Sequence, residues 1–286
     1  VGAMTACTML ATRGLQPFLK IAGFWLKFSE VTNAQQQLKQ IIDLCPEEDI
    51  TDIPQIRDVE GTVCFENVSL KGKDHSAFKI NSFDGIFHAG EFIGVDGRNQ
   101  EQTTGLMLLL CGMYKPDSGR IFIDEFLISS MDHSCFNGRV EYLPRKARLF
   151  NGTVLDNIAM FKPEKRDTAL DTASLFGLDS FVADLPNGYN TVVDQRSNDS
   201  LPQSLIQRIC LARAFVTAPR VLILDRTLNS LDKQTRELTC EIVKKLRGKC
   251  TVFIVSDYGG FQLPVDRIIT CSQDSIAVAA VEEAIK

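Results

Sequence analysis

The sequence predicts an α/β fold with a parallel sheet at its centre. Three runs, at residues 91–97, 219–225 and 250–257, are almost continuously apolar, which is typical of strands buried on both faces. Stretches with helical spacing lie between them, and segments 63–70 and 77–83 have the β-branched and aromatic content of strands. Strands that alternate with helices in this way indicate an α/β domain.

The amino-terminal part predicts a helix followed by a linker. Residues 1–12 are apolar or small, but Arg13, Lys20 and Lys27 interrupt the apolar run, so this segment cannot span a bilayer alone. Its continuation fits either a helix that leaves a membrane or an amphipathic helix packed on its own soluble domain. Residues 46–60 then contain two prolines, six acidic residues and one arginine. This composition indicates a linker. The expected parts are a helix over 1–45, a linker over 46–60 and an α/β domain over 61–286.

The helices of the α/β domain follow from the spacing of its apolar residues. Residues 103–114 form an apolar stretch directly after the first buried strand, and residues 204–217 repeat apolar side chains at helical intervals. Residues 231–249 contain a third helix, closed near its end by Gly248.

Composition excludes several classes of function. The formal charge is −5, so no basic field is available for a nucleic-acid backbone. Nine cysteines lie scattered without a CxxC pair, beside only three histidines. This pattern indicates reduced thiols and disfavours a disulfide scaffold or a zinc site.

The turn after the first buried strand has the place of a phosphate-binding loop but not its sequence. Residues 97–104 read GRNQEQTT, whereas a working loop reads GxxxxGK[ST]. Glycine lets the backbone approach the phosphates, and lysine neutralises them. Gln102 replaces the second glycine and Thr103 replaces the lysine, so the loop alone favours a plain strand-turn-helix connection.

Further motifs change that interpretation. In order and spacing, residues 61–286 resemble the ATP-binding cassette of ABC transporters through GLMLLLCGMYKPDSGRIFID, LFNGTVLDNIAM, QRICLARAF, PRVLILD followed by LNSLD, and TVFIVSD. The resemblance implies a P-loop NTPase-like fold with a parallel core sheet, an antiparallel β part and a helical lobe near residues 150–215. Residues 1–60 resemble the end of the last transmembrane helix of an exporter half-transporter, and bacterial type I secretion exporters of proteins and peptides are the most similar group.

The resemblance also implies which residues would meet a nucleotide, and most of these positions are altered. The aromatic residue that stacks on adenine is replaced by Gly72, the P-loop lysine by Thr103 and the metal-sensing glutamine by Arg145. Thr104 still offers a hydroxyl group where magnesium would be held. The implied nucleotide-binding positions are Gly72, Gly97, Asn99, Gln102, Thr103, Thr104, Arg145 and Asp225, with Thr104 and Asp225 as metal ligands only if magnesium binds.

The catalytic and signature positions are altered as well. Asp225 keeps the carboxylate after VLIL, but the catalytic glutamate is Arg226, which cannot serve as a general base at neutral pH, and the switch histidine is Asp257. The family's LSGGQ signature corresponds to Leu201, Pro202, Gln203, Ser204 and Leu205, which lack both glycines. Ser230, Leu231 and Asp232 still resemble the D-loop that crosses the dimer interface.

Three hypotheses of function follow from these departures. The first is a pseudo-ATPase subunit of an exporter, at the cytoplasmic face of the plasma membrane. It would pair with a second cassette and with a transmembrane domain upstream of Val1, and neither a bound cofactor nor nucleic acid is expected. The second is a working ABC ATPase that binds ATP and magnesium in a non-standard way, and the third is a soluble interaction module derived from a cassette.

The substitutions also predict internal ion pairs. Arg226 and Asp257 replace a glutamate and a histidine that lie close together in the family, and Arg145 would face the metal position beside Asp225. The pairs would be Arg226 with Asp257 and Arg145 with Asp225, because an unpaired buried carboxylate is costly. The alternative is that both arginines point to solvent, where a pair contributes about 0 to 1 kcal/mol. We favour the pair for Arg226 and the solvent-facing alternative for Arg145.

Overall fold

The computed structural model describes residues 2–44, 59–71, 79–130, 138–146, 148–194, 201–257, 260–272 and 276–280. The chain divides into two compact units, Val1–Asp52 and Ile53–Lys286. Within the first unit, helix α1 (Gly2–Leu44) is continuous through Pro17, and its described side chains Ile21 and Trp25 are exposed. No helix in the described residues, α1 included, has an apolar stretch long enough to cross a lipid bilayer. The predicted linker lies almost wholly outside the described residues.

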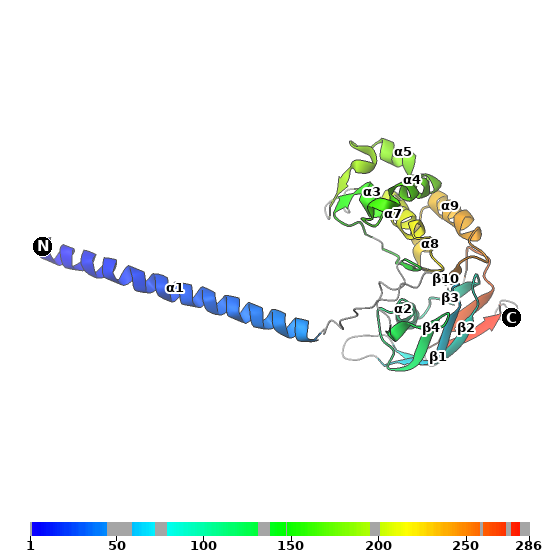
Figure 1. Ribbon diagram of the computed structural model, residues 1–286, viewed down its shortest axis with the longest axis horizontal. Coiled ribbons are helices and arrows are strands. Elements are labelled where there is room, and N and C mark those ends of the chain that lie inside the picture. The colour runs from blue at the N-terminus through cyan, green and yellow to red at the C-terminus, as the bar shows by residue number, and fades with distance from the viewer. Residues whose placement is uncertain are drawn as a thin grey trace. The chain divides into compact units, whose positions relative to one another are not determined.

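The second unit contains the predicted α/β domain (Figure 1). Its larger sheet has the order β12-β11-β3-β10-β9-β6, in which only β12 is antiparallel to its neighbour. These strands are β3 (Phe92–Asp96), β6 (Val140–Leu143), β9 (Val221–Asp225), β10 (Thr251–Ser256), β11 (Arg267–Cys271) and β12 (Ile276–Ala280). All three near-continuous apolar runs are therefore neighbouring strands of one parallel core, as predicted.

A second sheet is antiparallel, with the order β2-β1-β4-β5. Its strands are β1 (Val63–Leu70), β2 (Ile80–Phe87), β4 (Ser118–Ile123) and β5 (Phe126–Leu127), followed by the 3-10 turn η1 (Ile128–Ser130). This sheet confirms the antiparallel part that the family resemblance implied.

A group of helices forms a separate lobe, labelled α3, α4, α5 and α7 in Figure 1 and coloured from green to yellow. It comprises β7 (Gly152–Thr153), α3 (Val154–Ile158), η3 (Pro163–Lys165), α4 (Arg166–Leu175), α5 (Leu178–Ala183), η4 (Gly188–Asn190), β8 (Val192–Val193) and α7 (Gln203–Val216). The remaining helices are α2 (Gln100–Leu110), α8 (Thr227–Ser230) and α9 (Lys233–Lys244).

The parallel core is covered on both faces, which explains its apolar runs. On β9, Val221 and Ile223 pack with the antiparallel strands and α2, whereas Leu222 and Leu224 pack with the helical lobe. Because successive side chains of a strand point to opposite faces, a strand between two cores needs apolar residues at nearly every position. The register pairs Asp96 with Ser256 and Asp225 with Val255, so the carboxyl ends of β3, β10 and β9 lie side by side.

Glu141 on β6 is a half-buried carboxyl group next to this core. Its carboxylate accepts a hydrogen bond of 3.1 Å from the Thr217 hydroxyl, and burial raises the pKa of Glu141 to about 7. A carboxyl group whose pKa is raised by folding stabilises the protein below its unfolded pKa, and this contribution is lost as the pH rises through the folded value.

We predict that Glu141→Gln becomes more stable relative to the wild type as the pH rises from 5 to 8. The relative change should be of the order of 1 to 3 kcal/mol, since one pKa unit corresponds to about 1.4 kcal/mol. Urea unfolding at both pH values measures it. Glu237→Gln on the exposed face of α9 is the control, and identical pH profiles for both variants would contradict the prediction.

Candidate functional site

The loop between β3 and α2 is held by hydrogen bonds from within the protein. The Gly97 N–H donates to the Ser256 carbonyl at 2.7 Å, and the Arg98 N–H donates to the Asp96 carboxylate at 3.1 Å. Asn99 caps α2 by accepting from the Gln102 N–H at 3.3 Å. Backbone N–H groups at such a loop are the usual donors to phosphates. Here several of them already have protein acceptors, one of which is a carboxylate.

Thr103 points into the protein at the position of the P-loop lysine. Its side chain is fully buried, and its hydroxyl group donates to the carbonyls of Asn99 at 2.7 Å and Asp96 at 3.2 Å. The hydroxyl carries no charge toward the space beside the loop. Arg98 is the cation within the loop itself, and its guanidinium pairs with Asp96 at 2.5 Å.

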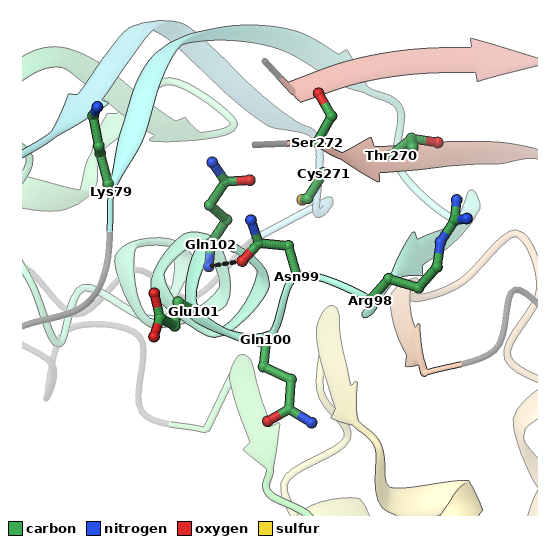
Figure 2. A pocket seen from close by; sticks show the side chains of 9 residues that line it. All are labelled: Lys79, Arg98, Asn99, Gln100, Glu101, Gln102, Thr270, Cys271 and Ser272. Carbon is green, nitrogen blue, oxygen red and sulfur yellow. Dashed lines mark hydrogen bonds between the residues drawn. The ribbon is translucent and has the colours of Figure 1, made fainter. Parts of the chain in front are cut away.

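A pocket of about 840 Å³ lies beside the start of α2 (Figure 2). It is bounded by the loop, by the start of β2 and by the end of β11, and Asn99 and Gln102 contribute carboxamides to it. Its lining residues are Lys79, Arg98, Asn99, Gln100, Glu101, Gln102, Thr270, Cys271 and Ser272. Gly72, the position implied for adenine stacking, lies outside the described residues.

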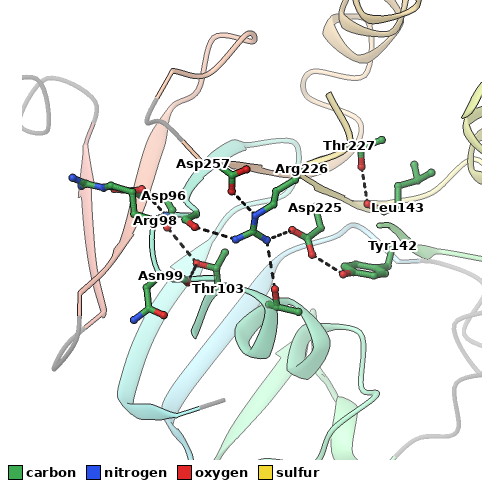
Figure 3. Close-up of polar contacts among 12 residues, drawn as sticks. Asp96, Arg98, Asn99, Thr103, Tyr142, Leu143, Asp225, Arg226, Thr227 and Asp257 are labelled. Atoms are coloured by element: carbon green, nitrogen blue, oxygen red, sulfur yellow. Dashed lines mark hydrogen bonds and ion pairs between the residues drawn. The ribbon is translucent and has the colours of Figure 1, made fainter. Parts of the chain in front are cut away.

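The carboxyl ends of β3, β9 and β10 meet at the guanidinium of Arg226 (Figure 3). Nε donates to Asp257 at 2.5 Å, and Nη1 donates to Asp225 at 2.6 Å. Nη1 also lies 3.5 Å from the Thr104 hydroxyl, and Nη2 donates to the Gly97 carbonyl at 3.0 Å. We call these five residues, Gly97, Thr104, Asp225, Arg226 and Asp257, the Arg226 cluster.

The Arg226 cluster confirms the predicted pair of Arg226 with Asp257, and for Arg145 it confirms the solvent-facing alternative. Arg226 pairs with Asp257 as expected. Asp225 does not pair with Arg145, because one of its oxygens accepts from Arg226 and the other accepts from the Tyr142 hydroxyl at 2.6 Å. Arg145 is exposed after β6 and lines a separate pocket of about 430 Å³ with Gly97, Arg98, Gln100, Asn229 and Asp257.

Tyr142 is the residue of this site that the sequence did not point to. It lies on β6, the neighbour of β9, and burial together with its hydrogen bond to Asp225 raises the pKa of its hydroxyl group. The sequence signal for Tyr142 is its place one residue before the end of β6, because β6 pairs with β9 and β9 ends at Asp225. The Asp96–Arg98 pair was missed as well, although its two charges flank Gly97.

The signature and D-loop positions lie on helix ends. Leu201 precedes α7, Pro202 occupies its N-cap position without a side-chain cap, and Gln203, Ser204 and Leu205 follow, with Leu205 buried. Gln207 of α7 donates to the Ser230 carbonyl at 2.9 Å, so the helix of the altered signature contacts the D-loop segment. Leu231 is buried, and Asp232 caps α9 by accepting from the Thr235 N–H at 2.9 Å.

The residues at the implied metal position do not fit a divalent ion. Thr104 and Asp225 are both present, but Nη1 of Arg226 lies between them and donates to Asp225. A magnesium ion there would have to displace a guanidinium whose side chain is only 6% exposed.

The fold, with this loop between a parallel strand and a helix, is that of an ABC cassette of the P-loop NTPase class. The family model described as ABC transporter matches residues 80–229, just over half of the chain. The chain therefore belongs to the ABC transporter family.

Similar proteins agree with this assignment. The chain is 27% identical to the leukotoxin export ATP-binding protein LtxB of Aggregatibacter actinomycetemcomitans over 96% of its own length, and 27% identical to the alpha-hemolysin translocation ATP-binding protein HlyB of Escherichia coli O157:H7 over 90%. It is 29% identical to the cyclolysin secretion/processing ATP-binding protein CyaB of Bordetella pertussis over 97%. The chain spans 39%, 36% and 39% of these relatives.

A solved structure agrees in fold. A bacterial Atm1-family ABC exporter with ATP bound superposes with a TM-score of 0.76 at 22% identity. The match covers 89% of this chain and 45% of that one. It shows that this chain has the cassette fold.

Proposed function

We propose that this chain is a degenerate cassette of an exporter-type ABC transporter that does not hydrolyse ATP and acts as a structural or regulatory subunit. The Arg226 guanidinium is the observation that carries the proposal. It stands at the family position of the general base, and it contacts both residues that would hold the metal. A protonated guanidinium cannot accept a proton from water, so the altered position removes the base as well as the metal site.

The other altered positions support the same function. Thr103 brings no charge to the loop, and the Arg98 guanidinium beside it is paired with the Asp96 carboxylate. Each lost charge-assisted contact to phosphate removes about 1.5 to 3 kcal/mol of binding free energy. Several such losses together weaken binding by several orders of magnitude.

The partners we propose are a second ABC cassette and the transmembrane domain of the same transporter. The relatives are named as export, translocation or secretion ATP-binding proteins, and this chain matches only part of each. We propose that residues 1–45 are the end of the last transmembrane helix and its cytoplasmic extension, and that residues 46–60 link them to the cassette at 61–286. The cassette would lie at the cytoplasmic face of the plasma membrane.

A titration with magnesium and ATP tests the proposal. We expect the purified chain to show no hydrolysis above background and no rise in melting temperature at millimolar magnesium-ATP, because ligand stabilisation requires concentrations above Kd. A cassette with intact motifs is the positive control. A saturable rise of several degrees, or hydrolysis that follows the amount of protein, would contradict the proposal and favour a working ATPase.

A further inference from the structure

The Arg226 cluster has the donor set of a cation site. Two carboxylates, one hydroxyl group and one backbone carbonyl surround the Arg226 guanidinium, and all of them present oxygen atoms to it. They come from the carboxyl ends of three neighbouring strands and from the first turns of α2. The Arg226 guanidinium therefore contacts the ends of all three strands and helix α2.

The guanidinium group matches this donor set through its shape. Each of its three nitrogens meets a different part of the site: Nε meets Asp257, Nη1 meets Asp225 and Thr104, and Nη2 meets Gly97. Arginine presents its donors as a rigid planar fork, whereas lysine presents one compact charge. The arrangement therefore depends on the fork as well as on the charge.

The backbone at Arg226 directs the side chain into the site. Residue 226 adopts a left-handed conformation, with φ of 54°, which non-glycine residues adopt rarely. It ends the extended strand β9, and the guanidinium reaches back to the carboxylate of the preceding residue. Gly97 accommodates it closely, because a Cβ atom there would lie 3.1 Å from Nη2 and 2.9 Å from the Ser256 carbonyl oxygen.

Both carboxylates of the site have protein partners without a metal. The side chains of Arg226 and Asp225 are 6% and 8% exposed, so both charges are removed from water and depend on each other. The second oxygen of Asp225 accepts from Tyr142, and Asp257 keeps 18% exposure. One guanidinium, one hydroxyl donor and partial hydration thus satisfy two carboxylates.

We propose that Arg226 is the resident cation of this cassette, and that its guanidinium holds the ends of β3, β9 and β10 together in place of a divalent metal. This goes beyond the loss of hydrolysis. Missing motifs alone would leave a vacant site, whereas here a side chain of the protein fills it. The wild-type protein is therefore independent of divalent metal, and removal of Arg226 exposes two carboxylates that can bind one.

Thermal unfolding with and without metal tests the resident cation. In EDTA and in 5 mM MgCl₂ or MnCl₂, we expect the same melting temperature for the wild type. We expect Arg226→Ala to unfold about 6 °C or more below the wild type in EDTA and to recover part of the loss in MnCl₂. Arg226→Lys should unfold at an intermediate temperature with little response to metal, and Arg145→Ala is the matched control at an exposed arginine.

A second measurement detects metal binding directly. Electron paramagnetic resonance with MnCl₂ compares the wild type with Asp225→Asn. We expect the wild type to show no signal of bound Mn²⁺ that is lost in this variant. Such an ion, a wild type stabilised by MgCl₂, or an Arg226→Ala variant as stable as the wild type would overturn the proposal. None of these readouts depends on ATP, so the resident cation and the absence of hydrolysis can fail separately.

Discussion

Arg226→Ala is expected to lower the free energy of unfolding by about 3 to 5 kcal/mol, because it leaves the Asp225 carboxylate buried without its cation. Asp257→Ala should cost less, about 1 to 3 kcal/mol, since Asp257 is more exposed and its loss leaves Arg226 paired with Asp225. The double variant should lose less than the sum of the two. The deficit from additivity measures the coupling between the two side chains.

Urea unfolding at pH 7 measures this cycle, with unchanged m-values as the sign that the same folded state is compared. Arg120 and Glu66 form the control cycle, because their ion pair of 2.8 Å joins side chains that are 65% and 46% exposed. Exposed pairs of this kind contribute about 0 to 1 kcal/mol. Strict additivity of Arg226→Ala and Asp257→Ala would mean that the short contact between them does not stabilise the fold.

The core of the fold was predictable because its signal is local. A strand between two cores needs apolar residues at nearly every position, and β3, β9 and β10 meet that demand within five or six residues each. The amino-terminal helix was predictable in kind but not in environment. Nothing in a helical pattern distinguishes side chains that face a bilayer, a protein or water.

The site was predictable only where position alone decided the contact. Arg226 and Asp257 end neighbouring parallel strands, so complementary charges at these two places had to lie close together. The partners of Asp225 depended instead on the direction of two side chains. Arg226 turns back through a left-handed residue and Tyr142 reaches over from β6, and neither direction can be derived from spacing along the chain.

Thr103→Lys alone is expected to leave magnesium-ATP binding undetectable. The new lysine would supply the missing charge, but the Arg226 guanidinium would still lie between Thr104 and Asp225, where the metal of magnesium-ATP would have to enter. The substitution would also remove the Thr103 hydroxyl group and its hydrogen bonds to the Asp96 and Asn99 carbonyls. The change in melting temperature on addition of millimolar magnesium-ATP, and the rate of phosphate release, should both match those of the wild type.

Thr103→Lys combined with Arg226→Glu and Asp257→His removes the internal cation as well. Thr104 and Asp225 then become available to a metal, and we expect magnesium-ATP to raise the melting temperature by several degrees, since a ligand at one hundred times its Kd stabilises by about 2.7 kcal/mol. Hydrolysis should stay at background, because residues 201–205 still lack the signature glycines.

Thr103→Lys with Arg145→Gln is the matched control, as it restores a charge and a carboxamide while keeping Arg226. If that control or Thr103→Lys alone bound magnesium-ATP as well as the triple variant, the guanidinium would not be what excludes the metal.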